Sequence, residues 1–598
     1  MIDCYKRILT EGEQTMTDQK TQALKHLVLL FIVVIPLFSL GISNHGLWSA
    51  DEPRVAEIGR EMAVNGNWAV PMLNQKPFLE EPPLYYGALA LTFKAFGVTD
   101  KVARIPSALF AFAAVLVLFF MANFLFGPRV ALLSGLILAT TGEYFRVAHW
   151  IIVDGALTFF VMSAMALFIT GYLAESNRKK LLCYTLLYVA CTFAFYAKGF
   201  IGIVIPGLSV LAFLAFERNL REILKMRLWL GFLIFLVMTL PWFIALWHQA
   251  GAEYLNVFFV HNHLQRFLPG SLAGKISGSA SGHHNPFYYY VTEFPGGFLP
   301  WSILLIPVFY HAFSKSGRSN TTDGRAEKGR LLAKCWFFAG IIFLSVASTK
   351  RTLYLMPIFA SMAMLTGSYI DSTLTAQSLN KVGKIFTWVL SMFLLVIGLT
   401  LTPAYFYLKE AFLSGVSSGF FGAVLAVSIL VTTISLVSIW YLLRGNLKGY
   451  WVSINIPIFL VLFFTLTAIV PILDRHKSFV PFCRQVTATV PADQPLYAYQ
   501  PDETLRGAVP FYTGRYVVET EELGSDLLER KEPFYIMIRD KREDLEKTLL
   551  STGRLNVLVK QEMGTDRALV LMSNRATEKP VTIGDPFKTV KGQKIFQF

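Results

Sequence analysis

Acidic residues in this sequence stand out where they border long apolar runs. Asp51 and Glu52 come just after the first such run, and Asp154 lies at the edge of another, in HWIIVDGALTFFVM. A charge at membrane depth is costly, so such residues are functional candidates by default. The Asp51–Glu52 pair could act as a general base or hold a cation, although acids are also preferred in a helix's first turn. Asp154 could instead reach toward the membrane interface.

Three cations also lie beside apolar runs. Lys350 and Arg351 form a basic pair in ASTKRTLYLMP, followed by Tyr354, and Lys198 separates two apolar runs in FYAKGFIG. Guanidinium and ammonium groups bind phosphate, which predicts an anionic ligand. The alternative for the basic pair is contact with lipid head groups, and Lys198 could simply mark a loop.

A divalent metal site is a further hypothesis. Glu80 and Glu81 precede two prolines, and His261 and His263 lie in FFVHNHLQRF together with Arg266. Carboxylates and imidazoles on one face can ligate a metal, and Arg266 would suit a phosphate. A capping role for Glu81 and a structural role for each histidine are the simpler alternatives.

Composition places the chain in a membrane. Of its 598 residues, 54% are hydrophobic and only 16% are charged, whereas soluble domains carry about 25% charged residues. The net charge of +14 does not indicate nucleic-acid binding. From Asp474 onward there are 19 Lys/Arg against 18 Asp/Glu, so the excess lies in short loops between apolar runs. The five cysteines have no metal-binding spacing.

The apolar runs predict about 13 transmembrane helices, because a span needs roughly 17–25 residues. We place them at 26–43, 103–126, 128–142, 154–174, 181–197, 199–216, 228–248, 298–314, 332–348, 353–370, 385–407, 418–443 and 450–471.

Loop charges predict the orientation. With the N-terminus inside, the inner segments hold 22 Lys/Arg and the longer outer loops before the tail hold 13. This distribution follows the positive-inside rule. It predicts a cytoplasmic N-terminus and a C-terminal segment on the other side, in the periplasm of a bacterial inner membrane.

The predicted outer regions carry most of the candidate residues. Two outer loops, 44–102 and 249–300, are too long to be simple connectors. Within the first, SADEPRVAEIGREMAVNG predicts an amphipathic helix that ends at Gly66 and lies on the membrane surface. Residues 1–471 would form the membrane domain. Residues 472–598, with β-rich runs such as FYIMIRD and LNVLVK, predict a soluble α/β domain.

Several motifs, in order, resemble those of one enzyme superfamily. ADEPRVAEIGREM, FLEEPPLYY, VDGALTFF, NHLQRF and FLSVASTKRTLYLMPIF are similar to segments of the GT-C glycosyltransferases. The resemblance is to the protein O-mannosyltransferase and aminoarabinose transferase group, most closely to the lipid A aminoarabinose transferases. It implies an α-helical polytopic membrane protein of GT-C type with a C-terminal extracytoplasmic α/β domain.

The resemblance also implies an activity. A GT-C enzyme of this group transfers a sugar, with inversion, from a polyprenyl-phosphate carrier to lipid A or another glycoconjugate. Asp51 would be the main catalytic carboxylate and Asp154 would support it. Arg266 with Lys350 or Arg351 would hold the carrier phosphate. Glu80 and His263 would share a divalent cation, such as Zn²⁺, Mg²⁺ or Mn²⁺.

Departures from the family motifs leave the substrates open. Glu81 stands where the aminoarabinose transferases have a phosphate-binding lysine, Val55 replaces a tyrosine, and Asn262 replaces a glutamate. The sugar could therefore be another pentose or hexose, and the acceptor could be a protein. A polyprenyl-linked glycan transporter and a membrane assembly module are alternatives from other classes.

Overall fold

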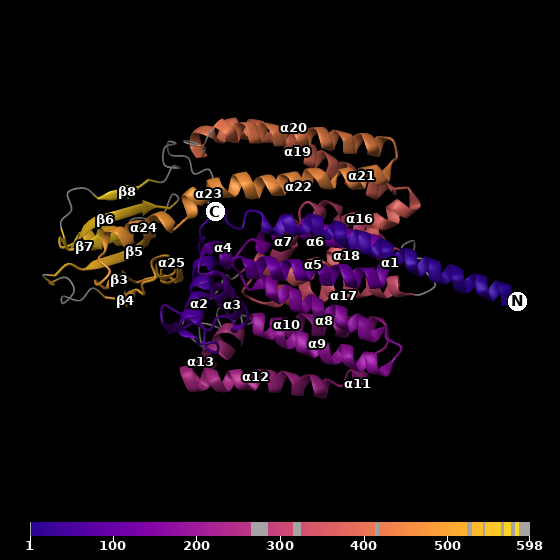
Figure 1. The fold of residues 1–598 in the computed structure, drawn as a ribbon, viewed down its shortest axis with the longest axis horizontal. Helices are drawn as coiled ribbons and strands as arrows, with labels where there is room; N and C mark the ends of the chain where they lie inside the picture. The colour runs from indigo at the N-terminus through magenta and orange to yellow at the C-terminus, as the bar shows by residue number, and fades with distance from the viewer. Residues whose placement is uncertain are drawn as a thin grey trace.

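The computed structural model describes residues 2–264, 285–314, 324–412, 416, 418–522, 529–530, 532–541, 544–563, 567–575 and 580–584. Long helices lie side by side in one bundle, and a domain containing a β-sheet lies at one end of it (Figure 1). The N-terminus lies at the opposite end of the bundle, and α2 and α3 lie between the bundle and the sheet.

Long apolar helices form the bundle, because they satisfy their own backbone hydrogen bonds inside a membrane. Together with the short helices that continue or connect them, the bundle helices are α1 (Ile2–Ser39), α5 (Ile105–Phe126), α6 (Pro128–Ala139), α7 (Gly142–Ala148), α8 (Asp154–Tyr172), α9 (Asn177–Lys198), α10 (Ile201–Phe216), α11 (Glu222–Met226), α12 (Leu228–Ala250), α15 (Tyr289–Gly297), η3 (Trp301–Leu304), α16 (Leu305–Phe313), α17 (Arg325–Val346), η5 (Thr352–Leu355), α18 (Met356–Ala376), α19 (Lys381–Phe412), α20 (Ser418–Leu443), α21 (Leu447–Ser453), α22 (Asn455–Phe464), η6 (Thr465–Ile469) and α23 (Val470–Lys477).

The protein is therefore an integral membrane protein. Among the described residues, ten helices are long and apolar enough to cross a membrane, or twelve if each of two bent helix pairs is one span. The bent pairs are α6–α7, with a bend of 71°, and α15–α16, with a bend of 114°. The one remaining predicted run, 199–216, corresponds to α10, which is a shorter apolar helix. The last span continues to Lys477, beyond the predicted end at 471.

Shorter elements cover one end of the bundle. They are α2 (Asp51–Asn65), β1 (Met72–Leu73), β2 (Lys76–Pro77), α3 (Leu84–Phe96), α4 (Asp100–Ala103), α13 (Ala252–Asn256) and the π-helix η1 (Val257–Leu264).

The predicted helix is confirmed as α2, and its apolar face packs on protein. It begins with Asp51 and Glu52 and ends before Gly66, whose φ of 70° suits glycine. It packs between α3 and the α/β domain, so Val55, Ile58 and Met62 on its apolar face are covered by protein. Most of its residues are buried, including the polar Glu57 and Glu61.

The α/β domain contains a six-stranded mixed sheet of order β4-β3-β5-β7-β6-β8. Its elements are α24 (Val480–Thr489), β3 (Leu496–Tyr499), α25 (Glu503–Thr513), β4 (Val518–Thr520), β5 (Tyr535–Lys541), α27 (Asp544–Leu550), β6 (Asn556–Glu562), β7 (Arg567–Ser573) and β8 (Val581–Ile583). Strands β3 to β7 match the predicted β-rich runs. The helix α25 packs on α2 and thereby joins the two parts of the molecule.

Candidate active site

Four of the predicted site residues come together at the bundle end that faces the α/β domain. Asp51 begins α2, Asp154 begins α8, Lys198 ends α9, and Arg351 directly precedes η5. Each therefore lies at a helix terminus or in the loop beside one. At such positions some backbone N–H and C=O groups have no hydrogen-bond partner within the helix, and polar side chains are tolerated there.

Asp51 is held by two guanidinium groups. Nη2 of Arg351 lies 2.5 Å from Oδ2 of Asp51, and Nη2 of Arg54 lies 2.9 Å from Oδ1. Burial alone would raise the pKa of Asp51, but Arg351, Arg54 and Lys198 lower it below its ordinary value. Asp51 is therefore a carboxylate at neutral pH.

Arg54 connects Asp51 to two further carboxylates. Its Nη1 lies 2.7 Å from Glu80 and 2.6 Å from Glu503, which comes from α25 of the α/β domain. Burial would lower the pKa of Arg54, but the carboxylates of Glu80, Glu503 and Asp51 raise it. Arg54 thus stays charged and shares its donors among three acids.

Asp154 and Lys198 form a buried ion pair. The Lys198 ammonium lies 2.6 and 2.7 Å from the two carboxylate oxygens of Asp154. It also lies 4.7 Å from the ring centre of Tyr354, a cation–π contact. Burial would lower the pKa of Arg351, but nearby side chains raise it. Asp51 has the largest effect of these, followed by Tyr354 and Asp154. The two ion pairs therefore belong to one electrostatic cluster.

A cavity of about 60 Å³ adjoins this cluster. Glu80, Glu81, Lys198 and Tyr354 line it, together with Asn262, whose side chain donates a 2.7 Å hydrogen bond to the Leu79 carbonyl. The remaining lining is largely apolar and comes from the α9–α10 turn and the end of α17. Charged and apolar walls in one cavity suit a group that is polar on one side and apolar on the other.

Glu52 and Lys350, two further predicted site residues, bind groups outside this ion-pair cluster. Both oxygens of Glu52 accept hydrogen bonds from the buried Arg104, and they also accept from the backbone N–H groups of Trp48 and Ile151. The Lys350 ammonium donates to the carbonyls of Asn285 and Ala347. These contacts argue for structural roles, Glu52 fixing the start of α2 and Lys350 fixing the loop before η5.

The remaining predictions concern the metal and the phosphate. Arg266 lies outside the described residues, as does the His263 side chain. Glu80 is bonded to Arg54. The described parts of the chain contain no group of three or more His, Cys, Asp or Glu side chains that could hold a metal ion. They therefore do not supply a donor set for a divalent cation, and we assign no chemical step to one.

Two residues of this cluster, Arg54 and Glu503, were not among the candidates predicted from the sequence. Arg54 lies three positions after Asp51 on one helix, and this spacing typically brings an acid and a base together. Glu503 lies 449 positions from Arg54 in an ordinary helix, so no local pattern indicates its role.

These features define a class of protein: a polytopic membrane protein of the GT-C fold with a cluster of ion pairs at one end of its helical bundle. Its structure superposes on the crystal structure of ArnT from Cupriavidus metallidurans bound to undecaprenyl phosphate with a TM-score of 0.71. The match covers 92% of this chain and 98% of that one, at 20% identity. The predicted fold class is thereby confirmed.

Sequence comparisons agree with the resemblance seen in the motifs. Residues 80–245 match the family described as dolichyl-phosphate-mannose-protein mannosyltransferase. The undecaprenyl phosphate-alpha-4-amino-4-deoxy-L-arabinose arabinosyl transferase of Pectobacterium carotovorum is 28% identical over 61% of this chain and 62% of its own length. A protein of the same description in Proteus mirabilis is 30% identical over 57% and 58%. The chain thus matches less than two thirds of the length of these relatives.

Proposed function

We propose that this protein is an inverting glycosyltransferase that moves a sugar from a polyprenyl-phosphate carrier to lipid A or another extracytoplasmic acceptor. The observation that carries the proposal is the partly buried carboxylate Asp51, held by Arg351 and Arg54 beside the Asp154–Lys198 pair at the end of the bundle. The names of the relatives support a carrier of the undecaprenyl-phosphate class.

The cations would act on the leaving group. The acceptor oxygen forms a bond to the anomeric carbon of the sugar while the bond from that carbon to the phosphate oxygen breaks. The phosphate leaves with the electron pair, and Arg351 and Lys198 would stabilise its charge. Donors placed where charge develops lower the barrier most when they are fixed in advance, as Lys198 is here by Asp154.

Asp51 would accept the proton of an acceptor hydroxyl. In the structure its pKa is lowered chiefly by Arg351, which makes it a weak base. A carrier phosphate would compete for Arg351 and draw it away from Asp51. The pKa of Asp51 would then rise toward its ordinary value, and its basicity would increase when the donor is bound.

Charge in the site favours an amino sugar. Around the cavity and its ion pairs, the described residues include five carboxylates (Asp51, Glu80, Glu81, Asp154 and Glu503) and three cations (Arg54, Lys198 and Arg351). Glu81 contributes to this excess, where the resembling enzymes carry a lysine. A protonated amine on the sugar would offset the negative charge.

Transfer to a protein is the second candidate. The observation that favours it is the match of residues 80–245 to a family described by its protein mannosyltransferase activity. The same site chemistry applies, because a serine or threonine hydroxyl is also a neutral acceptor.

Mass spectrometry of envelope glycoconjugates tests the proposal. Cells that express the wild-type protein should carry a sugar on lipid A, or on another glycan or protein, that is missing in cells without the gene. Asp51→Asn should abolish this product in the purified enzyme and leave binding of undecaprenyl phosphate within about threefold, since the arginines remain. A variant that keeps full transfer activity would show that Asp51 is not the base.

A further inference from the structure

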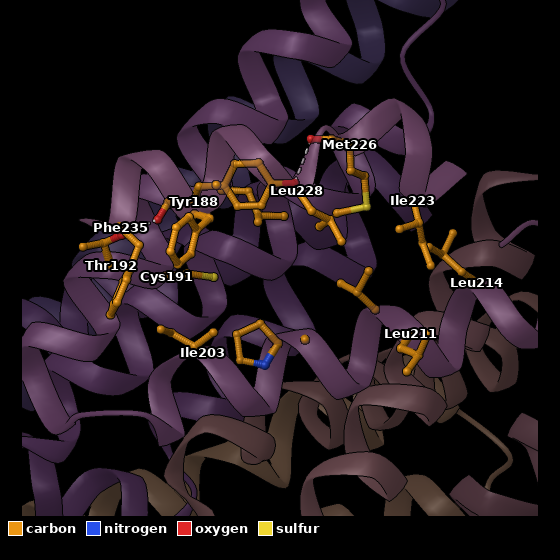
Figure 2. Close-up of a pocket in the computed structure, with 16 residues that line it drawn as sticks. Tyr188, Cys191, Thr192, Ile203, Leu211, Leu214, Ile223, Met226, Leu228 and Phe235 are labelled. Carbon is orange, nitrogen blue, oxygen red and sulfur yellow. Dashed lines mark hydrogen bonds between the residues drawn. The ribbon is translucent and has the colours of Figure 1, made fainter. Parts of the chain in front are cut away.

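A second, larger cavity lies inside the membrane-spanning bundle, between α9, α10, α11 and α12. Its volume is about 440 Å³, and it shares no lining residue with the cavity at the candidate active site. Figure 2 shows the side chains that surround it, with Tyr188 and Cys191 from α9, Leu211 from α10, Met226 from α11 and Phe235 from α12.

The lining suits a hydrocarbon chain. Its hydroxyl groups are already used: Tyr188 donates a 2.7 Å hydrogen bond to the Met226 carbonyl (Figure 2), and Thr192 donates a 2.9 Å bond to the Tyr188 carbonyl. Apolar cavities of about 150 Å³ stay dry and bind small hydrocarbons. A cavity of this kind within a bilayer is therefore filled by lipid rather than by water.

Glycines shape the cavity. At Gly231, a Cβ atom would lie 2.6 Å from the Tyr188 ring, so the glycine lets α12 approach α9 closely. At Gly207, a Cβ atom would meet nothing within 4 Å, so α10 leaves this side of the cavity open. Leu228 and Phe232 of α12 both line the cavity and are more than half exposed. The cavity therefore opens toward the surrounding lipid.

Positive charge lies at one end of the cavity. Ile223 and Met226 of α11 line that end, and the same segment, residues 217–227, carries Arg218, Arg221 and Arg227, which are exposed. Its acids are engaged, since Glu217 pairs with Lys328 and Glu222 with Lys180 and Lys225. Exposed cations beside a membrane attract anionic head groups, each contributing about 1 kcal/mol near the surface.

We propose that this cavity binds one acyl chain of an anionic phospholipid, whose head group contacts the arginines of residues 217–227. The bilayer itself is apolar, so selectivity comes from the fit of the chain and from the charge of the head group. The site is independent of sugar transfer, and its lipid would come from the leaflet at the α11 end, away from Asp51.

Native mass spectrometry of the purified full-length protein, with dioleoyl phosphatidylglycerol as the probe, tests the proposal. Gly207→Phe fills the cavity and should weaken phosphatidylglycerol binding roughly tenfold. The matched control Leu208→Phe places the same side chain on the exposed face of α10 and should bind as the wild type does. Equal binding by the two variants would overturn the proposal.

The head-group contact is tested separately at surface positions. Arg221→Gln combined with Arg227→Gln should weaken phosphatidylglycerol binding about fivefold per removed charge at low salt. Lys381→Gln with Lys384→Gln, exposed at the start of α19, should have no effect. Phosphatidylcholine should bind more weakly than phosphatidylglycerol. If undecaprenyl phosphate displaces phosphatidylglycerol at equal concentration, the occupant is the carrier and the proposal is wrong.

Discussion

At the scale of single residues, the described centre of the candidate site consists of paired charges. Arg351 and Arg54 bind Asp51, and Lys198 binds Asp154. A phosphate that enters must therefore compete with carboxylates that already hold its cations. This competition links donor binding to the state of Asp51, because removal of Arg351 from Asp51 makes the carboxylate more basic.

The Asp154–Lys198 pair should contribute to both stability and activity. Asp154→Asn removes one partner and leaves a buried ammonium uncompensated, which should lower the free energy of unfolding by about 3 kcal/mol. Thermal unfolding of the detergent-solubilised protein measures this loss, and a sugar-transfer assay measures activity.

The double variant Asp154→Leu with Lys198→Met separates the two roles. It replaces the pair with apolar side chains, so stability should return to within about 1 kcal/mol of the wild-type value. Transfer activity should stay at least tenfold lower if Lys198 stabilises the leaving phosphate. Recovery of both properties together would show that the pair is only structural.

At the scale of helices and strands, the sequence predicted which elements form better than it predicted what packs against them. Apolar runs predicted the spans because hydrophobic length is read directly from the chain. The amphipathic pattern of α2 also predicted its ends. That pattern could not distinguish a membrane surface from the underside of another domain, because both bury the same residues, such as Val55 and Ile58.

The contact between α2 and α25 should be sensitive to a single methyl group. A Cβ atom at Gly507 would lie 2.5 Å from the backbone of Pro53. Gly507→Ala should therefore push α25 away from α2 at a cost of about 1–3 kcal/mol. Limited proteolysis should show faster release of the α/β domain, and transfer activity should fall.

Gly87→Ala is the matched control. A Cβ atom at Gly87 meets only the Trp68 ring, at 3.9 Å, which is an ordinary contact. This variant should keep the proteolysis rate and activity of the wild type. If Gly507→Ala behaves in the same way, the packing of α25 on α2 does not position the site.

At the scale of the whole molecule, the α/β domain is part of the candidate site. Glu503 binds Arg54, and Arg539 donates to Ser49, close to the start of α2. Asn74, in the turn between β1 and β2, exchanges two hydrogen bonds with the backbone of Val517. Such contacts between residues more than 400 positions apart could not be predicted from one sequence, because they leave no pattern among neighbouring residues.

Glu503 should adjust the basicity of Asp51 through Arg54. In Glu503→Gln, Arg54 loses one of its carboxylates and acts more strongly on Asp51. The pKa of Asp51, already lowered in the wild type, should fall further. The acid limb of kcat/KM should then move to lower pH, and kcat should fall by roughly threefold because the base is weaker.

The lowered pKa of Asp51 also determines how the stability of the protein changes with pH. Because the pKa of Asp51 is lowered in the folded protein, the stabilisation that its carboxylate contributes is complete above the unfolded pKa of about 3.9 and is lost as the pH falls further.

As a control for Glu503→Gln, the variant Glu529→Gln removes an exposed acid that pairs with Arg554 in the same domain. It should leave the pH profile unchanged, and a shift as large as that of Glu503→Gln would contradict a specific role.

The contact between Arg54 and Glu503 has a consequence for biosynthesis. The ribosome synthesises Asp51 and Arg54 directly after α1, and all the other helices of the bundle are made before Glu503. A nascent chain can therefore insert into the bilayer with its arginine bound to only two of its three acids. The ion cluster reaches its final form only when the α/β domain that contains Glu503 has folded, so a chain terminated before Glu503 should occupy the membrane with an incomplete site.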